Sequence, residues 1–179
     1  LMLNGYNKTL QIYGPQGTEK MMKLYLGLFT HKDKISIQVK EINSNKIIET
    51  SDFLIQAEKM KHETPSIAYS FTIKEKIRLD KKKLAKLKIP REEMRKISDI
   101  QKGKNIVINK KTINAKSLIY KEAQRKLTII MDTLQNPNAQ KIAENSDILV
   151  CESTYSQEEK ELAGQHFHLT AEQAAQIAK

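Results

Sequence analysis

Apolar residues follow two periodicities along the chain, and a strongly charged segment separates the regions where they are clearest. Runs that are apolar throughout or alternate with period two predict β-strands; they cover residues 10–13, 35–39, 46–48, 53–61, 66–73, 127–131 and 148–151. Apolar residues at helical spacing predict helices over 18–30, 136–144 and 157–164. Thr170 and Gln173 have the spacing of a capping box, which predicts that a further helix begins there. The polar turn at 43–45 predicts a hairpin between 35–39 and 46–48.

The charged segment, residues 74–125, interrupts this pattern with smaller elements. We expect short helices over 79–87 and 92–97, separated by Pro90, and a small hairpin from 106–108 and 112–113. Antiparallel strands first and strand–helix alternation later predict the α/β class, as a layered sandwich. We therefore divide the chain into a first core part (1–73), an inserted basic α+β arm (74–125) and a second core part (126–179).

Composition narrows the class of protein. The chain has 179 residues, and a hydrophobic fraction of 39% excludes wholesale disorder. The single cysteine, Cys151, excludes a disulfide framework and a cysteine-rich zinc module. No run approaches the roughly 18 apolar residues of a membrane span. We expect a cytoplasmic protein without a membrane partner.

The formal net charge of +10 is unevenly distributed. Residues 73–126 carry 19 Lys and Arg against 6 Asp and Glu, a net charge of +13, and the remaining 12 and 15 give −3. A charged run is often only a solvated face, but this density favours an arm that contacts nucleic-acid phosphates. Tyr120 is the segment's only aromatic residue, so we do not expect base stacking to be its main mode of binding. The candidate RNA-binding residues are Lys81, Lys82, Lys83, Lys86, Lys88, Arg91, Arg95, Lys96, Lys102 and Lys104.

Two acidic residues are candidates for site chemistry. Asp132 and Glu152 each come directly after an apolar strand, and ligand groups gather at the carboxyl ends of strands in open α/β sheets. Carboxylates at such an edge bind metals, orient histidines or transfer protons. The alternative is that each carboxylate only caps the following turn or helix.

The histidines and the cysteine leave several interpretations open. His62, in a turn after a strand, is a candidate zinc ligand or a solvated loop residue. His168 precedes the helix that Thr170 caps, where anions such as phosphate are favoured, or it is a surface residue. His166 completes no metal-binding spacing. We expect Cys151, within a strand and without a basic neighbour, to be a buried and unreactive thiol.

Five motifs occur in one order along nearly the whole chain. They are LQIYGPQG at 10–17, HETPSIAY at 62–69, DT at 132–133, CESTY at 151–155, and HLT with EQAA at 168–175. Together they resemble the L-x-I-Y-G-P-x-G, H-x-x-P-S-x-G-Y, G-D-T, H-E-A-T-F and H-x-T-x-x-Q-A-A motifs of the ribonuclease Z family, the tRNA 3′-processing endoribonucleases. Five motifs in order are far more specific than any one of them.

The resemblance implies a fold and a set of roles. The fold would be part of a metallo-β-lactamase-like αββα sandwich, and the activity would be zinc-dependent removal of 3′ trailers from precursor tRNA. His62 would be a ligand of one zinc ion (Zn²⁺), and Asp132 would bridge two. His168 would donate a proton to the leaving group or contact a phosphate, with Glu152 orienting its imidazole. The arm would be an exosite for tRNA, and the enzyme would be a cytoplasmic homodimer.

Departures from the family motifs define the rival hypotheses. The family's His-x-His-x-Asp-His zinc motif and its last metal-binding histidine are absent, which leaves His62 and Asp132 as metal ligands. Met131, Ala68 and Cys151 replace two glycines and a histidine of the motifs. We therefore expect an incomplete portion of a longer protein that binds little zinc and cleaves nothing alone. The alternatives are a non-catalytic nucleic-acid-binding relative and another hydrolase of the same fold.

Overall fold

The computed structural model describes residues 7–28, 36–43, 45–108 and 110–179. They belong to two compact units. The core unit comprises Leu1–Thr72 with Lys126–Lys179, and the arm comprises Ile73–Arg125. Parts of three predictions, the end of the helix at 29–30, the strand start at 35 and the turn residue 44, lie outside the described residues.

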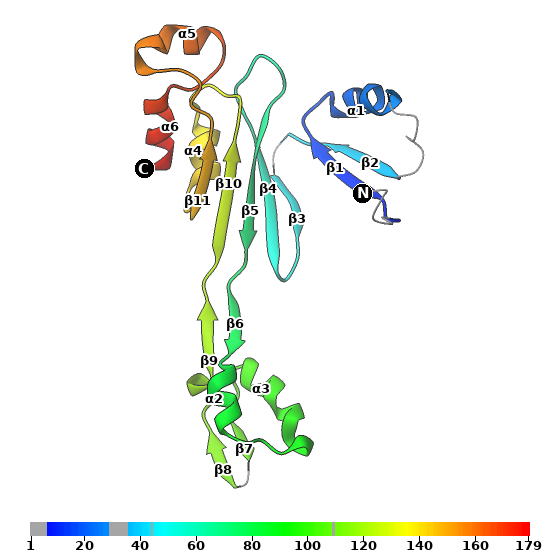
Figure 1. Ribbon diagram of the computed structural model, residues 1–179, viewed down its shortest axis with the longest axis vertical. Coiled ribbons are helices and arrows are strands. Elements are labelled where there is room, and N and C mark those ends of the chain that lie inside the picture. Colours follow the sequence, from blue (N-terminus) through cyan, green and yellow to red (C-terminus); the bar gives the residue numbers. More distant parts are fainter. Residues whose placement is uncertain (1–6, 29–35, 44, 109) are drawn as a thin grey trace. The chain divides into compact units, whose positions relative to one another are not determined.

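A five-stranded sheet organises the core unit (Figure 1). Its strand order is β11-β10-β5-β4-β3. The strands β10 and β11 are parallel, whereas β3 and β4 are antiparallel with an irregular register between Lys46 and Ile48. The sequence predicted all five strands. Their bounds are Asn45–Glu49 (β3), Phe53–Lys59 (β4), Ile67–Ile73 (β5), Arg125–Ile130 (β10) and Ile148–Cys151 (β11).

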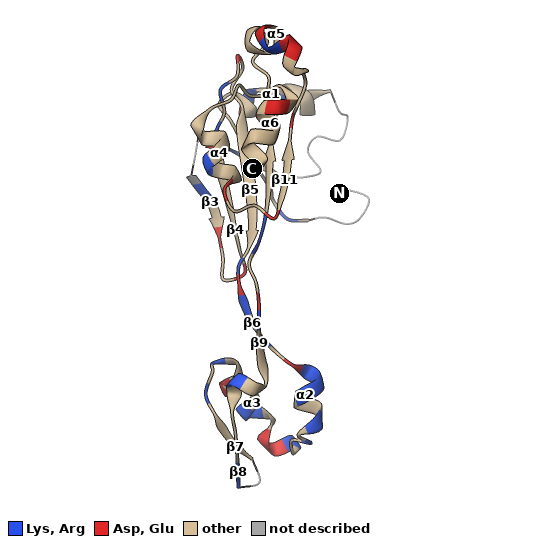
Figure 2. Cartoon of the chain, turned by 90° about the vertical axis from the view of Figure 1, so that its left-hand side faces the viewer, with Lys and Arg blue, Asp and Glu red and all other residues tan. Residues whose placement is uncertain are grey.

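Two helices, α4 and α6, lie against one face of this sheet (Figures 1 and 2). The hydrophobic core lies between the sheet and these helices. Ala68 and Ile130 of the sheet pack with Ile142 and Ile177 of the helices. Burial of these apolar side chains, worth roughly 25 cal/mol per Å², holds the two layers together. The helices after β10 are Pro137–Ala143 (α4), the 3₁₀ turn Gln157–Glu159 (η5), Lys160–Gln165 (α5) and Ala171–Ala178 (α6).

The helix starts follow from local capping chemistry. The Asn136 side chain accepts hydrogen bonds from the first-turn amides of α4, and Pro137 occupies the first helical position, where it costs no backbone hydrogen bond. At α6, Thr170 accepts from the Gln173 amide, and the Gln173 side chain accepts from the Thr170 amide. This reciprocal pair confirms the capping box predicted from the sequence.

The strands nearest α4 and α6 leave apolar side chains exposed. Alternation along a strand places successive side chains on opposite faces, and Ile129, Ile148 and Val150 are 39%, 60% and 47% exposed. Phe71 and Ile73 of β5 are exposed as well. In an αββα sandwich, the face of a sheet opposite its helices packs against a second sheet.

The first elements of the core unit form a β-α-β unit. β1 (Leu10–Gly14) and β2 (Ile37–Glu41) pair in parallel, with α1 (Thr18–Gly27) between them in the chain. The predicted hairpin is therefore wrong: β2 pairs with β1, and β3 pairs with β4 in the other sheet. The polar turn at 43–45 predicts only a local change of chain direction. It does not predict which strand the following residues pair with. The apolar stripe predicted for α1 exists but is exposed, at Met21, Leu24, Tyr25 and Leu28.

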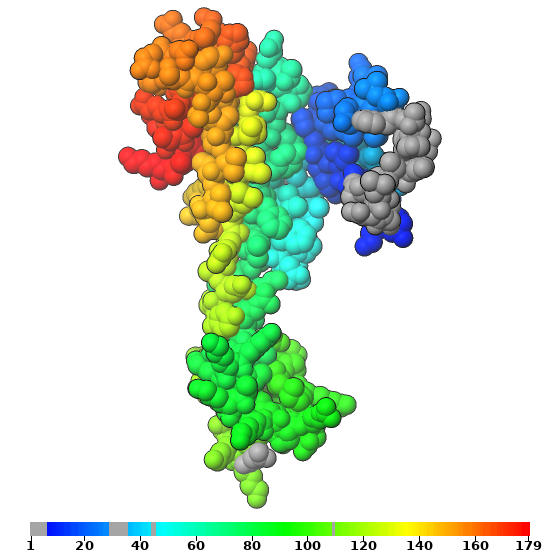
Figure 3. Space-filling model, viewed as in Figure 1, coloured from blue at the N-terminus to red at the C-terminus, as the bar shows by residue number. Residues whose placement is uncertain are grey.

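The arm has a hydrophobic core of its own, formed by Ile100, Ile106, Ile108, Ala115 and Leu118. This core is surrounded by two antiparallel strand pairs, β6 with β9 and β7 with β8, and by two short helices. Figure 3 shows the side chains of these elements packed into one body. The hairpin β7–β8 was predicted, whereas β6 and β9 were not. The elements are Lys76–Leu79 (β6), Lys81–Lys86 (α2), the 3₁₀ turn Arg91–Lys96 (η3), Ile97–Gln101 (α3), Ile106–Ile108 (β7), Lys111–Ile113 (β8), the 3₁₀ turn Ala115–Ser117 (η4) and Ile119–Glu122 (β9).

Candidate active site

The carboxyl ends of β10 and β11 bring two acidic residues together. Ile130 and Cys151 are register partners in the parallel pair, and the Glu152 amide continues the ladder by donating to the Ile130 carbonyl at 3.0 Å. Glu152 therefore follows β11 directly, and Asp132 lies two residues beyond the end of β10. One ligand atom each of Asp132, Glu152 and His168 lie within 4.8 Å of one another.

Glu152 is buried and fully engaged in hydrogen bonds. Its Oε1 accepts from the Thr133 amide at 2.9 Å and lies 3.0 Å from Nδ1 of His168, and its Oε2 accepts from the Thr154 hydroxyl at 2.6 Å. Burial by itself would raise the pKa of this carboxyl, but the hydrogen bonds from Thr154, Thr133 and His168 and the imidazole charge outweigh it. The pKa of Glu152 is thus lowered. The carboxylate is the form that the site holds.

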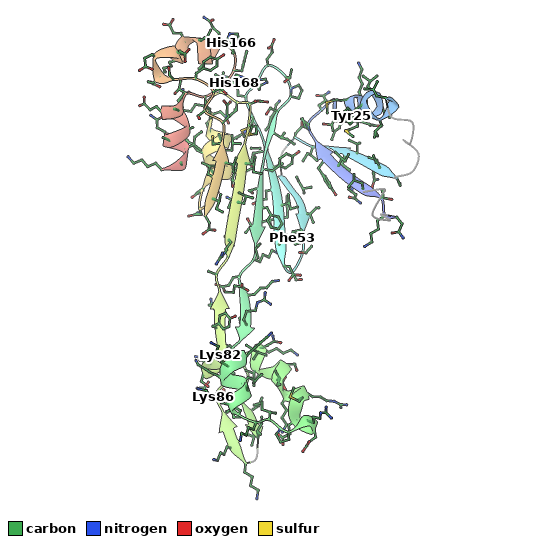
Figure 4. All side chains as sticks on the ribbon, viewed as in Figure 1. Tyr25, Phe53, Lys82, Lys86, His166 and His168 are labelled. Carbon is green, nitrogen blue, oxygen red and sulfur yellow. The ribbon has the colours of Figure 1, made fainter. Side chains whose placement is uncertain are left out.

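His168 lies in the loop between α5 and α6 (Figure 4). Its backbone amide donates to the Ala163 carbonyl at 2.9 Å, which fixes the loop. Because Glu152 is ionised and can only accept, Nδ1 of His168 carries a proton in this pair. Nε2 is then the ring nitrogen left for substrate or metal.

His62 reaches the same place from the loop after β4. The Thr133 hydroxyl accepts from the Lys61 amide at 3.1 Å, and the Leu134 amide donates to the Lys61 carbonyl at 2.8 Å. These bonds hold the loop beside the end of β10. The rings of His62 and His168 are 5.5 Å apart. Nδ1 of His62 accepts from the Thr64 amide at 3.3 Å and lies 3.1 Å from the Thr64 hydroxyl, so the neutral ring carries its proton on Nε2.

The donor set fits zinc in part. The imidazole of His62 and the exposed carboxylate of Asp132 offer nitrogen and oxygen, which zinc accepts, but binding through Nε2 would require the ring proton of His62 to move to Nδ1, away from the Thr64 amide. Glu152 fits less well, because both of its oxygens already accept hydrogen bonds. Zinc usually takes about four ligands, so two such side chains would make up only part of a coordination shell.

Cys151 is unsuited to nucleophilic chemistry. Burial, followed by the neighbouring Glu152 carboxylate, raises the pKa of its thiol to about 11. The thiolate is the reactive form, so this cysteine is unreactive near neutral pH. Cys151 is half-buried rather than buried as predicted, and its raised pKa agrees with the prediction of an unreactive thiol.

All ten candidate RNA-binding residues of the arm are exposed. Figure 2 shows the lysines of α2 in blue, and Figure 4 shows the side chains of Lys82 and Lys86 on that helix. Lys83 and Lys96 also serve the arm's own structure: their ammonium groups donate to the carbonyls of Ser117 and Val107. Lys82 and Lys86 make no ion pair within the described residues.

Comparison with known proteins identifies what the chain is similar to, although no family model matches it. Ribonuclease Z of Nanoarchaeum equitans is 33% identical over 172 residues, which cover 96% of this chain and 54% of that protein. Ribonuclease Z of Streptococcus uberis is 34% identical over 176 residues, 95% of this chain and 56% of that protein. The chain resembles ribonuclease Z. The resemblance carried by the five motifs is thereby confirmed, and the chain spans about half the length of these ribonuclease Z relatives.

Solved structures show the fold. Human tRNase Z, short form, superimposes with a TM-score of 0.59 at 17% identity, over 96% of this chain and 57% of that one. The metallo-β-lactamase fold protein YhfI of Bacillus subtilis gives a TM-score of 0.51 at 15% identity, over 96% and 47%. The predicted α/β class and metallo-β-lactamase fold are confirmed. Among the described residues, no helix is both long and apolar enough to cross a membrane.

Sequence reasoning missed the residues that support Glu152. Thr133 supplies its backbone amide to the carboxylate and its hydroxyl to the His62 loop. Thr154 donates its hydroxyl from two residues beyond Glu152. Both threonines lie inside motifs, so their position was visible, but spacing gives no indication of which polar atom faces which. Tyr155 and Phe167, whose rings lie beside the histidines, were missed for the same reason.

Proposed function

We propose that this chain is part of a zinc-dependent endoribonuclease that removes 3′ trailers from precursor tRNA by phosphodiester hydrolysis. The observation that supports the proposal most is the convergence of Asp132, Glu152 and His168 at one sheet edge, with His62 beside them. These are the residues that the ribonuclease Z motifs mark. The basic arm supplies the second feature that such an enzyme needs, a surface for RNA phosphates.

Glu152 acts through His168 in this proposal. The carboxylate holds Nδ1 and so fixes the orientation of the imidazole, which is a positioning role. When His168 is protonated, its second N–H is at Nε2, where it donates to the oxygen that leaves as the phosphodiester breaks. The Thr133 amide and the Thr154 hydroxyl keep Glu152 ionised and in place for this task.

His62 and Asp132 would hold zinc together with ligands that this chain does not provide. Bound zinc lowers the pKa of water enough to supply a nucleophile near neutral pH and polarises the phosphoryl oxygen. The chain's own contribution is to keep the two ligand side chains at a common edge: the Lys61–Thr133 and Lys61–Leu134 hydrogen bonds fix the two loops to each other.

The arm would bind the body of the tRNA. Its exposed lysines and arginines are dense, and Lys82 and Lys86 make no ion pair within the described residues, which suits phosphate contacts that position an RNA without reading its sequence. Structured RNA is recognised mainly through shape and its phosphate and ribose groups. Precursor tRNA is therefore the partner that we propose for Lys82, Lys86 and their neighbours.

The test compares this chain with a version extended to the length of its relatives. We expect the 179-residue chain to bind precursor tRNA, to take up well under two zinc ions, and not to cleave. The extended protein should cleave precursor tRNA at the 3′ side in the presence of zinc, as mapped on the product ends. Tight, stoichiometric zinc in the short chain, or no tRNA binding by either form, would contradict the proposal.

The same resemblance supports a homodimer in the cytoplasm. Sedimentation of the extended protein tests the oligomeric state, and a stable monomer at micromolar concentration would contradict it. Fluorescent tagging tests the location in the cell.

A further inference from the structure

Three aromatic side chains beside the catalytic cluster have no role in the chemistry proposed above. The Tyr155 ring stacks on His166 at 6.2 Å between centroids, with the planes 17° apart. The Tyr155 ring also lies 6.1 Å from the ring of His168. Phe167 meets His62 edge-on at 6.1 Å. Of these pairs Tyr155–His166 is the stacked one, and the rings together form an aromatic cluster beside the imidazole that Glu152 positions.

Tyr155 is rigidly held. Its amide donates to the Leu169 carbonyl at 3.3 Å, and its carbonyl accepts from the Ala171 amide at 2.9 Å. The two bonds form a parallel bridge to Thr170, which is itself fixed by the capping box of α6. These bonds fix the backbone from which the ring projects, so little backbone entropy is lost when a ligand stacks on it.

The loop that carries His166 is also fixed, and its backbone is strained at Phe167. Phe167 has φ of 62°, in the left-handed region that a bulky residue rarely adopts. The His166 amide donates to the Leu162 carbonyl at 3.0 Å, and the His168 amide donates to the Ala163 carbonyl at 2.9 Å, one on each side of Phe167. Such strain persists where surrounding contacts over-determine the backbone, which is common at functional sites. Here the strained residue lies between the two histidines.

The ring pair is accessible. Tyr155 is half-buried and His166 is exposed, and Figure 4 shows His166 in the α5–α6 loop near His168. Single-stranded RNA is recognised chiefly by splayed bases that stack on aromatic or histidine side chains. If a scissile phosphate lies at Nε2 of His168, the ring of Tyr155, 6.1 Å from the His168 ring, lies beside it.

We infer that Tyr155 and His166 form a stacking subsite for the nucleobase next to the scissile phosphate. The subsite rests on the proposed function, because His168 places the phosphate. It adds a contact to the single-stranded end of the substrate, independent of the phosphate contacts of the arm. Stacking accepts any base, so the subsite would register the presence of a base rather than its identity.

The test uses the 179-residue chain and a short single-stranded oligoribonucleotide that carries the fluorescent base 2-aminopurine at one position. Such an oligonucleotide is too short to need the arm. We expect binding to quench the base, because stacking on an aromatic ring does so. Tyr155→Leu should abolish the quenching and weaken binding about tenfold. Tyr155→Phe keeps an aromatic ring and should quench and bind as wild type does. Tyr25→Leu, a change at an exposed tyrosine on α1, is the matched control and should behave as wild type.

A second variant separates stacking from folding. If Tyr155→Leu does not fold, as judged by circular dichroism, His166→Ala changes an exposed side chain of the same pair and should reduce quenching several-fold. Equal quenching in wild type and in the folded variant would overturn the inference, and so would a failure of wild type to quench. Precursor tRNA is titrated in parallel. If tRNA binds but the variants at Tyr155 and His166 quench as strongly as wild type, only the subsite is wrong. If tRNA does not bind, the proposed function is wrong.

Discussion

The candidate active site and the arm use charged groups in opposite ways. In the core unit, Glu152 receives hydrogen bonds from three groups and is buried, so its position and ionisation are both fixed. In the arm, all ten candidate RNA-binding residues are exposed, and Lys82 and Lys86 have no ion-pair partner within the described residues. A proton-transfer group must be placed accurately, whereas a surface for phosphates needs only density and reach. The two regions therefore tolerate substitution very differently.

Removal of the arm should have the largest effect on RNA binding. Replacing residues 76–122 with a short Gly-Ser turn takes away most of the basic residues while leaving the core unit's sheet. We expect affinity for precursor tRNA to fall at least about a hundredfold, and the dependence of log Kd on log salt to flatten. Fluorescence anisotropy at several salt concentrations measures both. Unchanged affinity in a folded variant would show that the arm is not the exosite.

Reversal of two charges on α2 should produce a smaller effect of the same kind. Lys82→Glu with Lys86→Glu should weaken tRNA binding about tenfold and lower the salt slope by about one for each lost phosphate contact. Lys8→Glu with Lys20→Glu changes the net charge equally at exposed positions of the core unit and serves as the control. If both pairs weaken binding alike, overall charge rather than the arm's surface carries the affinity.

The sequence predicted the core unit better than the arm, for a physical reason. The strands β4, β5, β10 and β11 pack against a core, so their apolar periodicity was visible. The strands β6 and β9 lie in the charged segment, where Lys76, Arg78, Lys121 and Glu122 obscure the alternation. The pairing of β2 was mispredicted because a turn at 43–45 specifies a change of direction and not a partner.

The candidate site shows the same division between local and long-range information. Strand ends indicated Asp132 and Glu152, since parallel neighbours end at one edge. Nothing local could bring His62 to His168, which is more than 100 residues away in the chain; motif resemblance alone suggested it. The hydrogen bonds of Thr133 and Thr154 could not be predicted from the sequence, because they depend on side-chain orientation.

Glu152→Gln tests the fixed charge of the active site. The lowered pKa of Glu152 means that the ionised form stabilises the folded state above the ordinary pKa of a glutamate, and that this stabilisation is lost as the pH falls through the folded-state pKa. The amide cannot accept all three hydrogen bonds. We expect a loss of about 1–3 kcal/mol at neutral pH and a smaller decrease in stability below pH 5 than in wild type.

Urea unfolding between pH 3 and pH 7 measures this difference. Glu161→Gln removes an exposed carboxyl from α5 and is the control, with little expected change at any pH. A Glu152→Gln protein with the stability and acid sensitivity of wild type would show that the network around Glu152 contributes nothing to the fold.

Lys88→Gly should give the smallest effect, and it bears on the comparison most directly. Four of the described helices end before a residue with positive φ, where glycine is favoured. After α3 this residue is Gly103, after α4 and α5 in the core unit it is Asn145 and Phe167, and after α2 in the arm it is Lys88 with φ of 43°. Lysine is a poor choice for that backbone, so glycine at residue 88 should relieve strain.

We therefore expect Lys88→Gly to stabilise the arm by up to about 1 kcal/mol, seen as slower hydrogen exchange of arm amides, and to lower the salt slope of tRNA binding by about one. Lys88→Gln keeps the Cβ and removes the charge, so it should weaken binding equally without the gain in stability. Asn145→Gly should change stability by only a few tenths of a kcal/mol, because asparagine already tolerates the left-handed region. If Lys88→Gly and Lys88→Gln have equal stability, the backbone at residue 88 is not strained. If neither variant affects tRNA binding, Lys88 does not contact RNA.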